Sequence, residues 1–209
     1  MNKFTLNTPR FAPLIASACL LVGATSLHAG DASSGGLYMN TDAGVNLMDD
    51  LVVPGVGKIS LDPGLRWDLS MGYAFKIADK LTLGPELETG ILYNSMDQAT
   101  PLGGPSHPAS GDYYQVPVLG NVVLNWHFNT HWVAYAGAGA GCDLSITDTA
   151  ASSLIASETD FAWQVEAGIR YKFGGSSALG LGYKHLAFTP SGLNTVGNNS
   201  IVASYTINF

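Results

Sequence analysis

The chain has 209 residues and a formal charge of −7, because Asp and Glu outnumber Lys and Arg by 16 to 9. It is 46% hydrophobic but only 12% charged, about half the charged fraction of an ordinary soluble domain. The length fits one domain, and the acidic balance argues against nucleic acid as a partner, which needs clustered Lys and Arg.

The N-terminus has the composition of a targeting segment. Lys3 and Arg10 supply positive charge, residues 11–22 are largely apolar, and a small-residue cleavage motif follows. This apolar core is shorter than the ~20 residues that a membrane-spanning helix needs. We therefore expect a cleaved signal peptide over residues 1–29 and a mature domain over residues 30–209.

Eight segments of the mature chain alternate between apolar and polar residues with the period of two that a β-strand produces. The clearest is 65–75, where Trp67 and Phe75 share the apolar parity and Arg66 and Asp68 share the polar one. In chain order we predict strands at about residues 37–47, 65–75, 81–94, 114–128, 132–144, 161–173, 179–184 and 199–209.

The fifth segment, 132–144, consists mostly of Gly and Ala, and its parity is ambiguous. Trp132 and Tyr135 lie on opposite parities, so these two large aromatic residues would point to opposite faces of the strand. We interpret Val133 and Tyr135 as facing outward.

The connections between the predicted strands alternate in length. Long polar connections at 48–63, 95–112, 145–158 and 189–198 alternate with short ones at 76–80, 129–131 and 174–177. Transmembrane barrels show this alternation, with short turns on the periplasmic side and long loops outside. An even number of strands then places both termini of the chain in the periplasm.

A soluble eight-stranded barrel of the lipocalin kind would also alternate, with its apolar residues inside. Here the polar parity holds mostly Gly, Ala, Ser and Asn, which would make a poor solvent-facing surface. The chain also stops on the aromatic Phe209. The apolar parity carries aromatic residues near strand ends, as at membrane interfaces: Tyr73, Phe75, Tyr93, Trp126, Phe128, Tyr171, Phe173, Tyr205 and Phe209. The sequence therefore predicts an all-β, eight-stranded antiparallel up-and-down transmembrane β-barrel, whose closure satisfies the backbone hydrogen bonds in lipid.

The segments 161–171 (FAWQVEAGIRY) and 181–184 (LGYK), together with the terminal Phe209, resemble the small OmpA/OmpX- and opacity-type outer-membrane β-barrel proteins. The resemblance covers the whole mature chain. It implies the Gram-negative outer membrane, contact with outer-membrane lipid, and assembly by the barrel assembly machinery. That machinery recognises a terminal aromatic on the lipid-facing parity, so the resemblance makes Tyr205, Ile207 and Phe209 the assembly signal.

Charged residues on the inward parity of five predicted strands are the main candidates for chemistry. In a barrel of this size the interior is just wide enough for side chains to fill it. Because an unpaired buried charge is very costly, we interpret these residues as a structural network inside the barrel. The alternative is a narrow cation-preferring pore, since acids outnumber bases among them. The eight residues are Asp42, Arg66, Asp68, Glu86, Glu88, Glu166, Arg170 and Lys184.

The sequence offers little sign of an enzyme. A lipid A deacylase-like barrel would carry a His and a Ser two residues apart on the lipid-facing side of a strand, but His185 is followed by Leu186 and Ala187. Cys142 is the single cysteine of the mature chain, which argues against a disulfide or a zinc cluster. We expect no catalytic residues, no cofactor and no metal site.

The predicted long loops are the other candidate site, since surface loops often carry binding function. We predict a structural or adhesion-like surface role for a monomer, with the extracellular loops meeting an extracellular surface ligand. The alternative is a small porin or passive channel for ions or small solutes. The loops are acidic and hold Asp49, Asp50, Asp97, Asp112, Asp148, Glu158 and Asp160.

Overall fold

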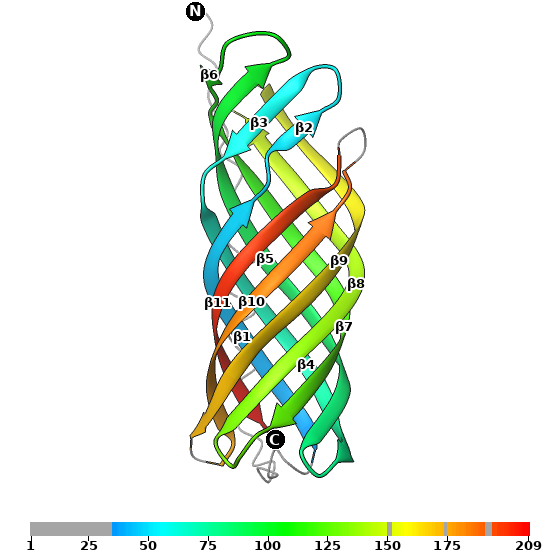
Figure 1. The fold of residues 1–209 in the computed structure, drawn as a ribbon. Coiled ribbons are helices and arrows are strands. Elements are labelled where there is room, and N and C mark those ends of the chain that lie inside the picture. Colours follow the sequence, from blue (N-terminus) through cyan, green and yellow to red (C-terminus); the bar gives the residue numbers. More distant parts are fainter. Residues whose placement is uncertain (1–34, 150–151, 174, 191–193) are drawn as a thin grey trace, which may run out of the picture.

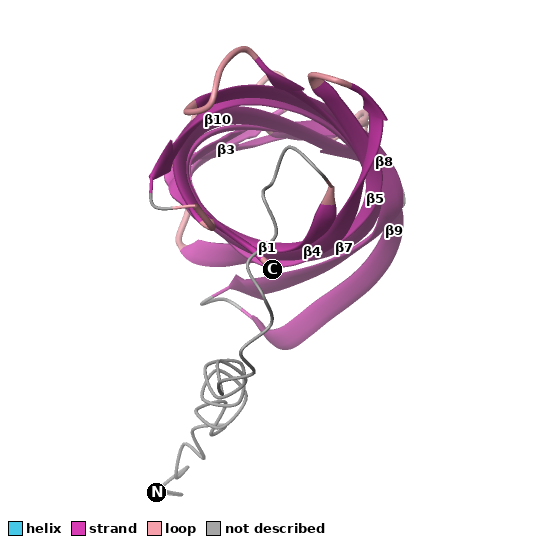
Figure 2. Cartoon of the chain, turned by 90° about the horizontal axis from the view of Figure 1, so that it is seen from below, coloured by secondary structure: helices cyan, strands magenta, loops and turns pink. Residues whose placement is uncertain are grey.

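Eight long antiparallel strands close into a single ring (Figures 1 and 2). The structure, a computed structural model, describes residues 35–149, 152–173, 175–190 and 194–209. The predicted signal peptide, residues 1–29, lies outside the described residues. The ring follows the chain and closes where the last strand pairs with the first. Its strands are β1 (Gly36–Met48), β4 (Gly64–Ala78), β5 (Leu81–Pro101), β7 (Gly111–His127), β8 (Trp132–Thr149), β9 (Ser152–Phe173), β10 (Ser177–Phe188) and β11 (Val196–Asn208).

The pairing of β1 with β11 shows how the alternation sorts side chains between two faces. Val45 lies opposite Ile201, and both point outward, with 50% and 62% of their surface exposed. Asp42 lies opposite Ser204, and both are buried inside the ring. A water-soluble barrel would have the opposite polarity, so the apolar exterior fits a lipid environment. The predicted all-β, eight-stranded up-and-down barrel is therefore confirmed. In the described part of the chain, no helix is long and apolar enough to cross a membrane.

Aromatic side chains form pairs on the outer face close to the short turns. Trp126 and Phe128 have ring centroids 4.6 Å apart, and Trp132 and Tyr171 lie 5.1 Å apart. We call this end of the barrel, which also holds the C-terminus (Figure 1), the turn end, and the opposite end the hairpin end. The aromatic side chains near the turns correspond to the interfacial belt of a membrane barrel.

The orientation of β8 differs from the prediction. Val133 and Tyr135 face the interior, with 3% and 4% of their surface exposed, so the interpretation that they face outward is wrong. The interior accepts Tyr135 because its neighbours leave room: a Cβ at Gly168 would lie 2.6 Å from Cε1 of the Tyr135 ring. The ring also stacks on the guanidinium of Arg170, with 3.7 Å between Cζ and the ring centroid. These cross-strand contacts are not encoded in the strand's own alternation.

The predicted long connections are largely built from strands. The prediction of a long loop at 145–158 is wrong, because β8 runs to Thr149 and β9 begins at Ser152. The predicted loop 95–112 is shortened, because β5 extends to Pro101 and β7 begins at Gly111. Beyond the lipid, the outward face of a strand meets water, so the apolar alternation that marks a membrane strand is lost there.

A short hairpin extends the wall at the hairpin end (Figure 1). It consists of β2 (Leu51–Val53) and β3 (Gly57–Leu61), and it lies within the predicted loop 48–63. β3 adds to the upper part of β5, where Ile59 pairs with Ala99, and β6 (His107–Pro108) also pairs with β5. The hairpin end is therefore a small ordered sheet above the barrel.

An apolar cluster fills the interior below this sheet, and we call it the apolar cap. Leu92, Leu119 and Leu186 are completely buried within it, and Phe188 is 1% exposed. These residues lie on the inward parity, which is otherwise polar. The cap also contains Met48, Leu51, Tyr113, Ala162 and Val196, with Ile59 and Leu61 packed against it.

Candidate functional site

A single lysine lies at the centre of the barrel interior. Lys184 on β10 is 1% exposed, and its Nζ lies 2.7 Å from Asp42 Oδ2 and 3.0 Å from Glu88 Oε1. The same nitrogen lies 3.1 Å from Asp68 Oδ2 and 3.6 Å from Glu166 Oε2. Four strands, β1, β4, β5 and β9, thus direct a carboxylate at one ammonium group on a fifth.

Arg66 on β4 is the second cation of this group. Its Nε donates to Asp68 Oδ2 at 2.6 Å, and its Nη2 donates to Glu88 Oε1 at 3.0 Å. Nη2 also donates to Gln164 Oε1 at 2.5 Å, and Gln164 Nε2 donates in turn to Glu88 Oε2 at 3.0 Å. Charge-assisted hydrogen bonds of this kind are about twice as strong as neutral ones, which offsets part of the cost of burying the charges.

Neutral amides supply donors that the two cations do not. Asn121 Nδ2 donates to Glu86 Oε1 at 3.1 Å and to Glu88 Oε2 at 2.9 Å, and Asn40 Nδ2 donates to Asp42 Oδ1 at 2.9 Å. The prediction named only charged residues and omitted these amides. Both amides lie on the inward parity of their strands, and this position could have identified them in the sequence.

The eight predicted interior residues are all buried, with exposures between 0% and 7%, but they divide into two groups. Ion pairs and the Asn121 bridge join seven of them into what we call the central network. Arg170 stands apart, nearer the turn end, where it contacts Asn125 and Tyr135. The network members are Asp42, Arg66, Asp68, Glu86, Glu88, Glu166 and Lys184.

Three asparagines form a neutral polar cluster inside the barrel, on the hairpin side of Asp42. Asn46 Nδ2 donates to Asn94 Oδ1 at 2.7 Å and to Asn198 Oδ1 at 2.9 Å, and Ser200 Oγ donates to Asn46 Oδ1 at 2.8 Å. The inward residues of β1 follow the same order, from Asp42 in the network through Asn46 to Met48 in the cap. Along β1 the interior therefore changes from charged to neutral polar to apolar toward the hairpin end, whereas Leu92 and Leu119 of the cap pair directly with Arg66 and Glu88.

Two aspartates face each other on the inner wall near the hairpin end. Asp143 and Asp160 are paired across β8 and β9, with exposures of 0% and 9%. Gln115 Nε2 donates to Asp143 Oδ2 at 2.9 Å. Asp160 was predicted to lie in a loop; this is wrong, because β9 begins at Ser152, eight residues before Asp160. Within the described residues, no group of three or more His, Cys, Asp or Glu side chains is arranged to hold a metal ion.

Several of the predicted loop acids make local contacts at the hairpin end. Asp50 pairs with Lys58 at 2.7 Å across the β2–β3 hairpin, and Asp112 accepts a hydrogen bond from Tyr93 Oη at 2.9 Å. Asp49 accepts one from the backbone N–H of Gly197 at 3.1 Å. These contacts hold the hairpin end together. The side chains of Asp148 and Glu158 lie outside the described residues.

His185 lies on the outward face of β10, the face on which a lipid A deacylase-like barrel would carry its catalytic histidine. Its Nδ1 lies 3.0 Å from Asn199 Oδ1, which also accepts from Tyr183 Oη at 2.6 Å. Its ring lies 5.4 Å from that of Trp163. Among the hydrogen bonds of the described residues, none joins this imidazole to a serine or cysteine. Asn199 therefore accounts for the orientation of His185.

The predicted assembly signal lies along the last strand. Tyr205 faces outward with 38% of its surface exposed, and its Oη lies 3.2 Å from Ser177 Oγ. The Phe209 backbone N–H donates to Leu37 O at 2.9 Å, which ties the C-terminus to β1. Recognition of Tyr205, Ile207 and Phe209 by the assembly machinery stays a prediction.

A closed antiparallel barrel with an apolar exterior, aromatic side chains near its turns and a charged, filled interior defines the class of small transmembrane β-barrels. Residues 17–209 match the family model described as the outer membrane protein beta-barrel domain, and the chain belongs to this family. It is therefore a protein of the Gram-negative outer membrane, and its short turns face the periplasm.

Solved structures support this assignment of the fold. Neisserial surface protein A (NspA) is 14% identical, with a TM-score of 0.59 over 83% of this chain and 97% of that chain. The outer membrane protein OprG from Pseudomonas aeruginosa is 15% identical, with a TM-score of 0.54 over 84% of this chain and 97% of that one. At these identities the similarity extends to the fold alone. No curated protein matches the chain in sequence.

Proposed function

We propose that this protein is a non-conducting membrane anchor that presents its hairpin end as an interaction surface outside the cell. The observation that carries the proposal is the double closure of the interior. The central network occupies the middle of the barrel, and the apolar cap fills it below the extracellular sheet.

The two closures oppose ion passage for different physical reasons. A permeating cation would have to displace Lys184 from four carboxylates, and breaking a buried ion pair costs about 3–5 kcal/mol. It would then meet completely buried leucines in the cap, where apolar walls disfavour water and ions. The second candidate function, a narrow cation channel, is favoured by the excess of acids in the central network and by the Asp143–Asp160 pair.

The hairpin end has the features of a preformed binding surface. Val56 and Leu102 expose 64% and 74% of their surface at neighbouring tips, and the Leu102 backbone N–H donates to Val56 O at 2.7 Å. Exposed apolar side chains on an ordered sheet bind a partner with less loss of conformational entropy than a disordered loop would. We therefore place the contact surface on these tips.

Cell attachment tests this surface role. Bacteria that display the protein are compared with bacteria displaying Val56→Ser/Leu102→Ser, for attachment to host cells or to one another. We expect the double variant to lose the attachment that the wild-type protein confers. Ile77→Ser is the matched control, because Ile77 is also an exposed apolar residue, with 54% exposure, but lies at the turn end. Equal attachment by all three strains would contradict the proposal.

No enzymatic step forms part of this proposal. His185 is oriented by Asn199, and the interior carboxylates of the central network are engaged with cations and amides. A signal peptide over residues 1–29, assembly through the C-terminal strand and a monomeric state complete the proposed description.

A further inference from the structure

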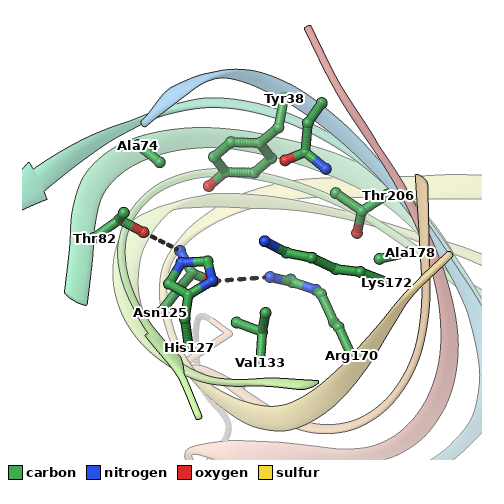
Figure 3. Close-up of a pocket in the computed structure, with 11 residues that line it drawn as sticks. Tyr38, Ala74, Thr82, Asn125, His127, Val133, Arg170, Lys172, Ala178 and Thr206 are labelled. Atoms are coloured by element: carbon green, nitrogen blue, oxygen red, sulfur yellow. Dashed lines mark hydrogen bonds between the residues drawn. The ribbon is translucent and has the colours of Figure 1, made fainter. Parts of the chain in front are cut away.

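A cavity of about 40 Å³ lies inside the turn end of the barrel, below the central network (Figure 3). The described residues that line it include three basic side chains, His127, Arg170 and Lys172, and no Asp or Glu. In Figure 3 the Lys172 amino group and the Arg170 guanidinium point in the same direction, toward His127. Three basic side chains around one cavity raise the electrostatic potential inside it.

Arg170 is the key residue, because it is a buried cation that forms no close ion pair with a described carboxylate. It is 7% exposed, and its Nη1 donates to Asn125 Oδ1 at 3.0 Å. Asn125 is held in turn by Thr82, with 3.3 Å between Nδ2 and Oγ1. Among the described residues, no carboxylate lies within 4.0 Å of the Arg170 guanidinium, and its buried Nε has no hydrogen-bond acceptor. Burying a charge in this way is costly unless something neutralises it.

The other two buried cations show the contrast. Lys184 has three carboxylate oxygens within 3.1 Å, and Arg66 has two within 3.0 Å. The acids next above Arg170 on the inner wall are Glu86 and Glu166. Glu86 Oε1 accepts from Asn121, and Glu166 Oε2 faces Lys184. The nearby acids therefore contact the central network, and Arg170 interacts with Glu166 only at longer range.

We propose that this cavity binds a small oxyanion of the carboxylate or phosphate class that enters from the periplasm. The Arg170 guanidinium supplies planar donors that match such an anion, and Lys172 and His127 add positive potential. The cavity has room for about three water molecules, which limits the occupant to an ion the size of phosphate or acetate. The site goes beyond the proposed surface role, because it lies at the opposite end of the barrel.

Isothermal titration calorimetry with inorganic phosphate as the probe tests the proposal. The protein is purified from outer membranes in a neutral detergent and a buffer without oxyanions, and its folded state is checked by gel mobility before boiling. Sodium chloride at equal ionic strength serves as the blank. We expect saturable binding of one phosphate per barrel, lost in Arg170→Gln and weakened about tenfold in Lys172→Gln, the loss of one charge-assisted hydrogen bond.

Lys76→Gln is the matched control, because it also removes one positive charge at the turn end. The Lys76 side chain is 46% exposed and lies 3.7 Å from Asp79 Oδ1, away from the cavity. This variant should bind phosphate as the wild-type protein does. Lys172→Gln keeps the test decisive if Arg170→Gln fails to fold, because Lys172 is less deeply buried. Absence of saturable binding to the folded wild-type barrel overturns the proposal, as does an equal loss of binding in Lys172→Gln and Lys76→Gln.

Discussion

The central network and the apolar cap close the same barrel by opposite means. The network surrounds Lys184 with four carboxylates and depends on the completeness of its ion pairs. The cap contains leucines and a phenylalanine that exclude water and depends on the volume they fill. Each part is therefore sensitive to a different change: the network to the loss of a charge, and the cap to the loss of side-chain volume.

Lys184→Met should give the largest loss of stability. It leaves four buried carboxylates without their shared cation, and removing one partner of a buried ion pair costs about 3–5 kcal/mol. The measurement is the urea concentration at half-unfolding of the protein in lipid vesicles, followed by gel mobility before boiling. An unfolding midpoint equal to that of the wild-type protein would show that the network adds no stability.

Phe188→Ala should come next and tests the cap. Phe188 is 1% exposed, and truncation of a buried phenylalanine costs about 3–5 kcal/mol, with the exact cost set by how far the cavity collapses. Thermal unfolding of the same preparations measures the effect. Ile201→Ala, on the lipid-facing parity with 62% exposure, is the comparison variant and should cost clearly less.

Arg170→Ala should cost less stability than a change within the central network or the apolar cap, because Arg170 belongs to neither. It loses one hydrogen bond to Asn125 and the stacking on Tyr135, which together are worth about 1–3 kcal/mol. Arg66→Ala should cost more in the same urea titration, since Arg66 is paired with two carboxylates. If the order of the two arginine variants were reversed, Arg170 would have to belong to the structural network.

The smallest expected effect is the coupling between the two layers. Lys184 and Phe188 lie on the inward face of β10 with Leu186 between them, roughly 13 Å apart along the strand. Free energies of unfolding for the double variant should therefore equal the sum of the single ones within about 0.5 kcal/mol. A larger coupling would mean that the network and the cap form one cooperative unit.

Most of the barrel was predictable because lipid imposes a strict pattern on it. In the segment 65–75 the large apolar residues lie outside and Arg66, Asp68 and Ser70 lie inside, as predicted. Burial of Asp42, Arg66 and Lys184 follows from the same parity. Which charges meet does not, because the pairing depends on the stagger of five strands around the ring.

The features that could not be predicted lie in segments where the alternation does not distinguish the two faces of the strand. In β8 the Gly and Ala residues leave both faces similar, so the inward position of Tyr135 is decided by Gly168 and Arg170 on a neighbouring strand. The apolar cap occupies only a few inward positions per strand, such as Leu92 and Leu186, and these are too few to change the pattern of a segment.

Single-channel conductance in a planar bilayer tests the central claim, the closed interior, most directly. The protein is first shown to be folded by the faster migration of the unboiled sample on a gel, and a porin of known conductance confirms insertion in parallel. We expect no channel openings, because the central network and the apolar cap both block the barrel axis. Discrete, reproducible, cation-selective openings from the folded barrel would contradict this expectation and would make Glu86, Glu88 and Glu166 candidates for pore residues.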